Sequence, residues 1–464
     1  MPVNIIEIPK RADGSDQGID DYLGEGGLLE ELEVRAFEEG WMPPEDWPEL
    51  PEEALHGPAG KVVEHIRPNT EADPVAILSL FLASFGNACG RGAHFTVEDT
   101  RHYLKLFTVI VGESSKSRKG TAQGRINKLI SRLDDGWAAK CFKQGLSSGE
   151  GVIHHVRDKK TKTDKVGKLV VVDEGVSEKR LLIEEEEFAS VLIMMAREGS
   201  ILSTILRSAW DDKRLAIMTK NSSETASDTH ITVVGHITRD ELLRHMTSNK
   251  LGGGIANRFS FFLVRRSKLL SRGGGHEEWP EGLIEELRAA VEFGKVKRCI
   301  DLCEEPEPEC GGRSAGGLWD EVYPELSEAA PGLFGVVTSR AEAQVRRIAT
   351  LYAVLDRSRV VRVAHLLAAL ASGSGPLGVQ PPVLLSALWA EDWRCLGRRD
   401  HGRPRRRRGR GHDPVRDQPL LRQQPPVGPA AGCAQRPRKG RVGPLGEGRQ
   451  RGAGSSRDQV VVDP

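Results

Sequence analysis

Short apolar runs rich in β-branched residues alternate with longer helical stretches through the middle of the chain. The short runs predict buried strands at 104–111, 168–173, 180–184, 230–238 and 255–264. Two helical stretches, EFASVLIMMAREG and LSTILRSAW, lie between the third and fourth of these runs. This alternation predicts an α/β fold in which helices cover a mostly parallel sheet.

Helical patterns also precede and follow this region. Asp73 followed by Pro74 is typical of an N-cap and a first helical turn, and VAILSLFLASFGNAC is apolar on nearly every side, as expected for a buried helix. LIEELRAAVEFG and a helix pair at 341–371, with a turn at 356–358, predict a C-terminal helical lid. Residues 1–50 are acidic and turn-rich, which predicts an extended lead-in with one short helix.

These patterns divide the chain into five segments. They are an acidic lead-in at 1–56, a helical N-terminal part of the core at 57–100, an α/β domain at 101–272, the helical lid at 273–371 and a tail at 372–464. The tail is a mixture of Arg, Gly, Pro, Ala and Gln with scattered hydrophobic residues. It cannot bury enough apolar area to offset its ordering entropy, so we predict that it is disordered.

Charge is distributed unevenly along the chain. The 66 basic and 66 acidic residues cancel, but residues 397–464 hold 17 basic and 6 acidic groups, which leaves 49 basic and 60 acidic groups in residues 1–396. One interpretation is a basic tail that binds the phosphates of nucleic acid. The other is an out-of-frame C-terminus, because the helical pattern breaks abruptly at HLLAALASGSGPL.

Composition excludes several classes of protein. Seven irregularly spaced cysteines do not describe a disulfide framework, and we expect a reducing compartment. No apolar run is long enough for a membrane span and the N-terminus lacks the order of a signal peptide, so we expect a soluble cytoplasmic protein. Cys299, Cys303 and Cys310 lack the paired spacing of a zinc site, which makes a structural metal a weak hypothesis.

The segment VIVGESSKSRKGTA carries the clearest chemical pattern. A phosphate-binding loop needs backbone amides at a helix N-terminus, a lysine for the β- and γ-phosphates and a hydroxyl for Mg²⁺, and Gly112, Lys119 and Thr121 can fill these roles. Strict counting from Gly112 puts Arg118 in the lysine place, and Lys116 is a rival to Lys119. The alternative is a polar surface loop that leads into a helix.

Polar groups that end the neighbouring strands extend this pattern. LLIEEEEF supplies carboxylates of the kind that Mg²⁺ and an attacking water need, and strand alternation would put Glu185 and Glu187 on one face. The alternative is a solvated acidic turn. His236 ends the strand HITVVGHIT at a position where P-loop ATPases hold a γ-phosphate sensor, although a structural hydrogen bond is the commoner role. Arg258 is a candidate for a charge delivered to a neighbouring subunit's phosphate.

Several short segments, taken in their order along the chain, resemble the YfjI-like family. This family is a group of RecA-like P-loop NTPases of unknown function that is associated with the primases and helicases of mobile elements. The segments include RHYLKLFTVIVGESSKSRKGT, GLSSGEGVI, RLLIEEEEFASVL, GHITRDEL and ANRFSFFLVRRSKLL, and the resemblance covers about residues 57–371. By position it implies a phosphate loop and a set of site acids with one arginine. The loop residues are Arg118, Lys119, Gly120 and Thr121, and the other residues are Glu150, Glu185, Glu187 and Arg258.

The resemblance also implies ligands and partners. ATP and Mg²⁺ would be the cofactors, with Thr121 and Glu185 holding the Mg²⁺ through ATP. The partners would be single-stranded or forked DNA, a primase and further copies of the chain in a ring-like homo-oligomer. We therefore predict an ATPase that acts on DNA in the replication of a mobile element. The alternatives are a degenerate, non-catalytic nucleotide- or DNA-binding module and a truncated, inactive product.

Overall fold

A computed structural model describes most of the chain between residues 49 and 374 and two short strands before it. The described residues are 4–6, 34–36, 49–113, 116–217, 224–246, 254–275, 278–328 and 332–374. The tail predicted at 372–464 therefore falls almost wholly outside them, as does the short helix expected within 1–50. In the lead-in, β1 (Asn4–Ile6) pairs antiparallel with β2 (Val34–Ala36).

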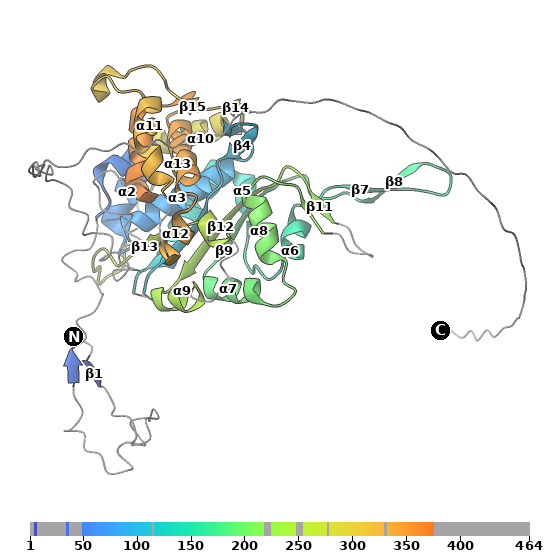
Figure 1. Cartoon of the computed structure of the whole chain (residues 1–464), viewed down its shortest axis with the longest axis horizontal. Helices are drawn as coiled ribbons and strands as arrows, with labels where there is room; N and C mark the ends of the chain where they lie inside the picture. The colour runs from blue at the N-terminus through green and yellow to red at the C-terminus, as the bar shows by residue number, and fades with distance from the viewer. Residues whose placement is uncertain are drawn as a thin grey trace, which may run out of the picture. The chain divides into compact units, whose positions relative to one another are not determined.

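A five-stranded sheet, parallel throughout, forms the centre of the molecule (Figure 1). Its strands, in order across the sheet, are β13 (Phe259–Leu263), β5 (Phe107–Val111), β12 (His230–Ile237), β9 (Arg180–Glu185) and β6 (Phe142–Lys143). Every residue of β5, β12 and β13 is buried, because helices cover both faces and leave no side open to water. The prediction of an α/β fold with a mostly parallel sheet is confirmed.

Helices pack on both faces of this sheet. The longest, α3 (Pro74–Cys89), begins at the N-cap Asp73, whose Oδ1 accepts the Val75 amide at 3.0 Å. The others are α2 (Gly57–Ile66), α4 (Lys119–Leu133), α5 (Asp135–Lys140), α6 (Gly149–His155), α7 (Phe188–Ala196), α8 (Leu202–Trp210), α9 (Arg239–Met246), α10 (Glu281–Lys295), α11 (Ala315–Leu326), α12 (Gly332–Thr338), α13 (Ala341–Leu355) and α14 (Val363–Ala369). Among the described residues, none of these helices combines the length and apolarity needed to cross a bilayer.

The remaining strands form small separate sheets. They are β3 (Ala93–Val97), β4 (Thr100–Tyr103) and β14 (Arg298–Cys299) in one sheet, and the pairs β7 (Lys160–Thr163) with β8 (Leu169–Asp173), β10 (Leu215–Ala216) with β11 (Thr225–Ala226), and β15 (Asp301–Leu302) with β16 (Val360–Val361). The run predicted as a strand at 168–173 is thus a strand, but it lies outside the central sheet. Its pattern of Leu and Val is the same as that of a buried strand, and only the surrounding structure separates the two cases.

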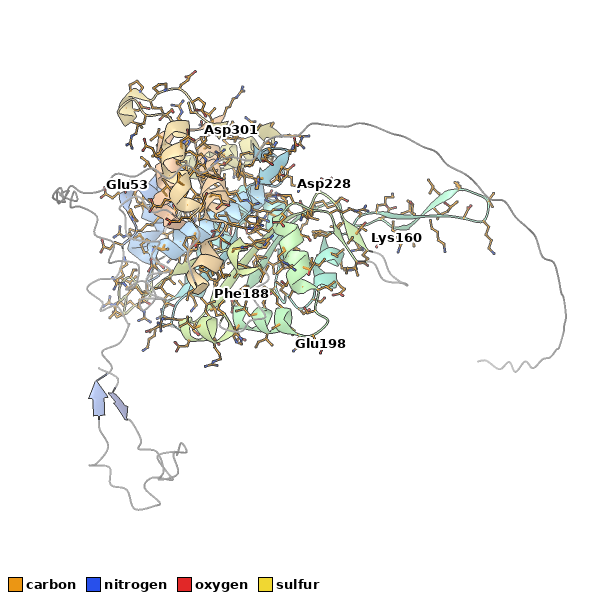
Figure 2. The ribbon with its side chains drawn as sticks, viewed as in Figure 1. Glu53, Lys160, Phe188, Glu198, Asp228 and Asp301 are labelled. Carbon is orange, nitrogen blue, oxygen red and sulfur yellow. The ribbon has the colours of Figure 1, made fainter. Side chains whose placement is uncertain are left out.

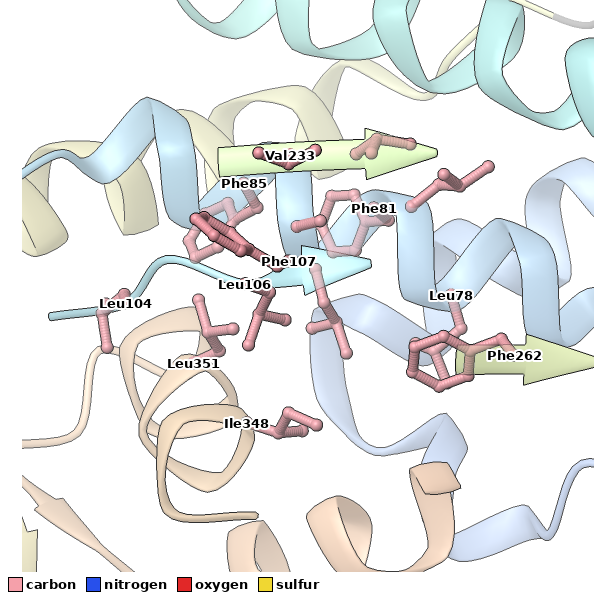
Figure 3. Packing of buried hydrophobic residues seen from close by; sticks show 14 of the residues in the cluster. Leu78, Phe81, Phe85, Leu104, Leu106, Phe107, Val233, Phe262, Ile348 and Leu351 are labelled. Atoms are coloured by element: carbon pink, nitrogen blue, oxygen red, sulfur yellow. The ribbon is translucent and has the colours of Figure 1, made fainter. Parts of the chain in front are cut away.

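One hydrophobic core joins the segments that the sequence divided. Figure 3 shows Phe81 and Phe85 of α3 beside Phe107 of β5, with Ile348 and Leu351 of α13 in the same cluster. Twelve of the fifteen residues of α13 are buried. The segment predicted as a helical lid is therefore part of the core, because α13 contributes a helix face that the core needs for closure.

Candidate functional site

The loop between β5 and α4 lies at the carboxyl end of the central sheet. Gly112 follows the last residue of β5, and its amide donates to the Ile237 carbonyl of β12 at 3.1 Å. A Cβ on Gly112 would lie 2.6 Å from the Val264 carbonyl oxygen and 2.8 Å from Ser117 Oγ, so a residue with a side chain does not fit there. Glycine thus lets the chain turn between two neighbouring strand ends.

Arg118 turns the chain into α4. It adopts a left-handed conformation (φ 55°, ψ 29°), which is uncommon for residues other than glycine. Its Nε donates to Glu71 Oε2 at 2.6 Å, and Arg266 Nε donates to the Lys116 carbonyl at 3.0 Å. The loop is therefore held from both sides, by the segment before α3 and by the segment after β13. Ser114 and Ser115 lie outside the described residues.

Lys119, the first residue of α4, folds back over its own loop. Its Nζ donates to the Gly112 carbonyl at 2.5 Å and to the Glu113 carbonyl at 3.1 Å. Burial lowers the pKa of Lys119 to about 8, although the carboxylates of Glu241 and Glu113 oppose the shift. The ammonium is hydrogen-bonded mainly to uncharged carbonyls. An anionic ligand that replaced these carbonyls would therefore add a charge–charge attraction to the ammonium.

The next residues of α4 face outward. Gly120 and Thr121 are exposed, and a Cβ on Gly120 would meet no atom within 4 Å. The first amides of a helix have no intrahelical acceptor, so this turn presents donors and a hydroxyl to any ligand at the loop. Lys116 is also exposed, and it is Lys119 whose Nζ contacts the Gly112 and Glu113 carbonyls. The structure thus favours Lys119 over Lys116 and Arg118 as the lysine of the loop.

His236 lies on β12 beside this loop. It pairs in register with Ile110 of β5, two residues before Gly112. Its side chain is 3% exposed, and Nε2 has no hydrogen-bond partner within the described residues. Burial, followed by the charge of Lys119, lowers the pKa of His236 to about 4. The imidazole is therefore neutral at pH 7 and has an unused nitrogen close to the lysine.

The buried histidine predicts a stability loss on acidification. Because the folded-state pKa of about 4 lies below the unfolded value of 6.5, the unfolded chain binds more protons between them, and stability is lost as the pH falls. From about pH 7 to about pH 5 this contribution is about 2 kcal/mol. In His236→Gln, urea unfolding should show a loss that is smaller by about this amount. Equal losses in the two proteins would contradict the assignment.

Glu184 is the strand acid that faces α4. It is 4% exposed, and its Oε2 accepts the Asn127 amide of α4 at 2.9 Å. Gln123, one turn nearer the loop, donates to Asn127 Oδ1 at 2.8 Å. Burial raises the pKa of Glu184, and the neighbouring acids Glu186 and Glu185 add to the shift. No cation among the described residues forms an ion pair with this carboxylate, which favours a positively charged ligand on this face.

The other predicted acids do not share this position. Glu185 points to the opposite face, where its Oε1 accepts the Leu146 amide at 2.5 Å. Glu187 lies outside the strand and is the exposed N-cap residue of α7. The first residue of α7, Phe188, packs against Gly235 on the face of the sheet away from α4. Glu150 is exposed in the first turn of α6, after the N-cap Ser148. The expected pairing of Glu185 with Glu187 fails because the strand ends at Glu185.

Arg258 lies at the far end of the sheet. It immediately precedes β13, whose Phe259 pairs with Phe107 at the start of β5, so it is roughly 15–20 Å along the strands from the loop. Its Nη2 donates to Asp211 Oδ2 at 2.8 Å, and the side chain is buried. Within one chain Arg258 does not join the site, and its charge is already balanced.

The sequence interpretation missed two polar residues of α4, Gln123 and Asn127, which lie in line with the predicted Lys119. Lys119, Gln123 and Asn127 are spaced four residues apart, so they form one stripe along α4 that leads from the loop to Glu184. Glu241 was also missed: with Thr238 it forms a capping box at α9, since the Glu241 amide donates to Thr238 Oγ1 at 3.3 Å and the Thr238 amide donates to Glu241 Oε2 at 3.2 Å. The four-residue spacing in the helical segment could have indicated Gln123 and Asn127. The T-x-x-E motif could have indicated Glu241.

A second polar cluster lies away from the loop. His56 Nε2 and His365 Nε2 lie 2.7 and 3.0 Å from Asp356 Oδ2, in a geometry that could hold a metal ion. However, His365 Nδ1 accepts the Arg362 amide, so Nε2 carries the proton and is not a free ligand. The cluster instead connects the start of α2 to the end of α13. The three cysteines 299, 303 and 310 form no such group within the described residues.

Comparisons with protein families and with curated proteins found no match to this chain. The geometry of the site is defined by residues of β9, β12, α4 and the loop before α4. It combines helix N-terminal amides, a lysine folded over its loop, a neutral histidine and a buried acid on one face. These are the elements needed to bind a phosphate chain together with a divalent cation.

Proposed function

We propose that this protein is a P-loop ATPase of the RecA-like class. The observation that carries the proposal is Lys119 Nζ, which lies within hydrogen-bond distance of the Gly112 and Glu113 carbonyls at the start of α4. On binding, the β- and γ-phosphates replace these carbonyls as partners of the ammonium, while the free amides of the first turn of α4 take the remaining phosphate oxygens. The resemblance to the YfjI-like family supports the same proposal.

Thr121 at the loop and Glu184, which by register lies roughly 10 Å before the loop along the strands, offer the chemistry that suits a hydrated Mg²⁺ beside these phosphates. A hydroxyl and a carboxylate are the ligands that such an ion takes from a protein, often through water, and Mg²⁺ supplies neutralisation of the phosphate charge. Glu184 replaces Glu185 in this role because it faces α4 while Glu185 is bonded to the Leu146 amide. His236, between the loop and the acid, is suited to contact the γ-phosphate through its unused nitrogen.

ATP hydrolysis is proposed to drive work on DNA, in the replication of a mobile element together with a primase. This part of the proposal rests on the resemblance. A homo-oligomeric ring would allow a neighbouring chain to supply a cation to the phosphates, as P-loop ATPases use arginine fingers. Arg258 is not suited to this role, since its guanidinium is held by Asp211.

A non-catalytic nucleotide-binding module is the second candidate. It is favoured by one observation: neither Glu187 nor Arg258, the acid and the arginine expected for hydrolysis, lies at the loop. Nucleotide binding without turnover, in the presence of DNA, would support this candidate. Steady hydrolysis would exclude it.

Substitution of Glu184 separates binding from hydrolysis. Glu184→Gln should lower Mg²⁺-dependent ATP hydrolysis by about 10²-fold or more, because an amide cannot neutralise or position the ion, while ATP binding without Mg²⁺ persists. The fold should tolerate the change, since Gln can still accept from Asn127 and burial already disfavours the charged carboxylate. Phosphate release and fluorescent-nucleotide binding measure the two effects. Glu186→Gln, at an exposed neighbour, is the matched control and should keep full activity.

A further inference from the structure

The hairpin of β7 and β8 is exposed along its whole length. Figures 1 and 2 show it extending away from the sheet, with Lys160 on its first strand, and every residue from 159 to 172 is exposed. Its apolar side chains include Val166, Leu169 and Val172, which are 90%, 69% and 60% exposed. A two-stranded hairpin without a third strand or a covering helix is marginally stable in water. Such a surface is expected to gain its stability from a partner.

The base of the hairpin is braced firmly. Arg157 donates to both carboxylate oxygens of Asp173, at 2.7 and 3.2 Å. Asp158 accepts from Lys179 Nζ at 3.0 Å and from Ser227 Oγ at 2.9 Å. Gly175 fits against the Lys159 backbone, where a Cβ would lie 2.5 Å from the amide nitrogen. The exposed ribbon is thus presented from a fixed base rather than from a loose loop.

The hairpin is strongly basic on a body that is close to neutral. Residues 159–172 contain five lysines and one aspartate, a formal charge of 5 − 1 = +4, whereas the rest of residues 57–371 carries 40 basic and 41 acidic groups. Lys159 pairs with Glu174, and Asp164 is used within the tip, where it accepts the amides of Val166 and Lys168. No ion pair within the described part of the chain involves the side chains of Lys160, Lys162, Lys165 or Lys168.

We infer that this hairpin is a nucleic-acid contact that binds the phosphate backbone. A two-stranded β-ribbon fits the major groove of a duplex, and four uncompensated lysines on a ribbon of this width match the phosphates that flank it. The register places Thr161 with Val171 and Thr163 with Leu169 on one face, opposite Lys162. That face offers methyl groups to bases and hydroxyls to phosphates.

In the proposed DNA-dependent ATPase, the hairpin would be the surface that contacts DNA. Its expected effect on ATP hydrolysis rests on that proposed function. Residues 174–179 join the hairpin directly to β9, which ends in Glu184 and Glu185. A load on the ribbon therefore acts on the strand that carries the candidate Mg²⁺ acid. Nucleic acid bound at the hairpin should stimulate hydrolysis, and loss of the hairpin charge should remove the stimulation but leave basal turnover.

Salt-dependent binding by the full-length chain tests the inference. A labelled oligonucleotide is used, single-stranded in one arm and duplex in the other, and anisotropy is followed without nucleotide so that a failure of ATP chemistry does not affect the result. The test variant combines three hairpin substitutions, Lys160→Gln, Lys162→Gln and Lys168→Gln. The control removes the same charge at exposed sites elsewhere, with Lys140→Gln, Lys213→Gln and Lys297→Gln.

The test variant should bind at least about tenfold more weakly, and its plot of log K against log salt should be flatter by about 3, because each lysine accounts for about one phosphate contact. The control should match the unmodified chain in both. Equal slopes in all three proteins would overturn the inference, whichever arm is used. So would a loss of self-association in light scattering for Leu169→Lys with nucleic-acid binding unchanged, which would assign the hairpin to a second copy of the chain.

Discussion

Lys119→Ala should lower Mg²⁺-dependent ATP hydrolysis by about 10²–10³-fold, because it removes the ammonium that the first turn of α4 directs at the loop. The loss should appear in turnover and in nucleotide affinity, since the lysine contacts the phosphates before and during transfer. Rates of phosphate release and fluorescent-nucleotide titrations measure the two. The fold should survive, because the hydrogen bonds of this side chain within the described residues all go to residues of its own loop.

Lys116→Ala is the matched control for this experiment. Lys116 lies in the same loop but is exposed, and its backbone contact with Arg266 does not depend on its side chain. Its activity should remain within about twofold of the unmodified chain, as is usual for a surface substitution. If Lys116→Ala lost activity and Lys119→Ala kept it, the loop would have the other lysine at the phosphates. If neither variant changed hydrolysis, the proposed site would be wrong.

Arg258→Met should destabilise the fold by about 3–5 kcal/mol, the cost of removing one partner of a buried ion pair. Asp211 would lose its bidentate partner, and the remaining cations Arg340 and Lys213 lie 3.8 Å from it. Arg258 also lies 5.6 Å from the Trp210 ring, so packing at α8 would be disturbed as well. Urea unfolding followed by fluorescence or circular dichroism measures the change.

The exposed Arg197, at the C-cap of α7, is a matched control for the charge change. Arg197→Met should alter the free energy of unfolding by less than about 0.5 kcal/mol. A stable Arg258→Met protein that had lost only ATP hydrolysis would reverse the conclusion, because it would assign the arginine to the phosphates of a neighbouring chain. Loss of stability with the residual folded protein still active would support the structural role.

Local patterns predicted the elements well where burial is complete. β5, β12 and β9 fall within the runs of β-branched residues, and α3 begins at the Asp73 N-cap as the Asp-Pro pair indicated. Strands covered on both faces are apolar at nearly every position, so their sequence pattern identifies them as strands. The run LVVVD shows the limit of this reasoning. The same composition forms the exposed strand β8, because nothing packs on it.

The site was predicted in part. The structure places Lys119 and His236 beside the loop, as the order of strand, loop and helix in the sequence indicated, and their role in phosphate binding stays a prediction. The acid that faces α4 was assigned wrongly, because the alternation of strand side chains was extended as far as Glu187. In the structure β9 ends at Glu185 and the chain turns into α7, so the alternation does not apply to Glu187. The spacing of Gln123 and Asn127 in the sequence already places them on one face of a helix. Only the packing of α4 against β9 shows that this face contacts Glu184.

The sequence alone determined the α/β class, the buried α3 helix and the strand–loop–helix order around Lys119, because each depends on residues that are neighbours along the chain. Tertiary structure decided which acid faces α4, that Arg258 is paired with Asp211, that α13 belongs to the core and that β7 and β8 stand apart. These outcomes depend on strand order and on contacts between residues far apart in sequence, such as Arg258 with Asp211. Local propensity carries no information about such contacts.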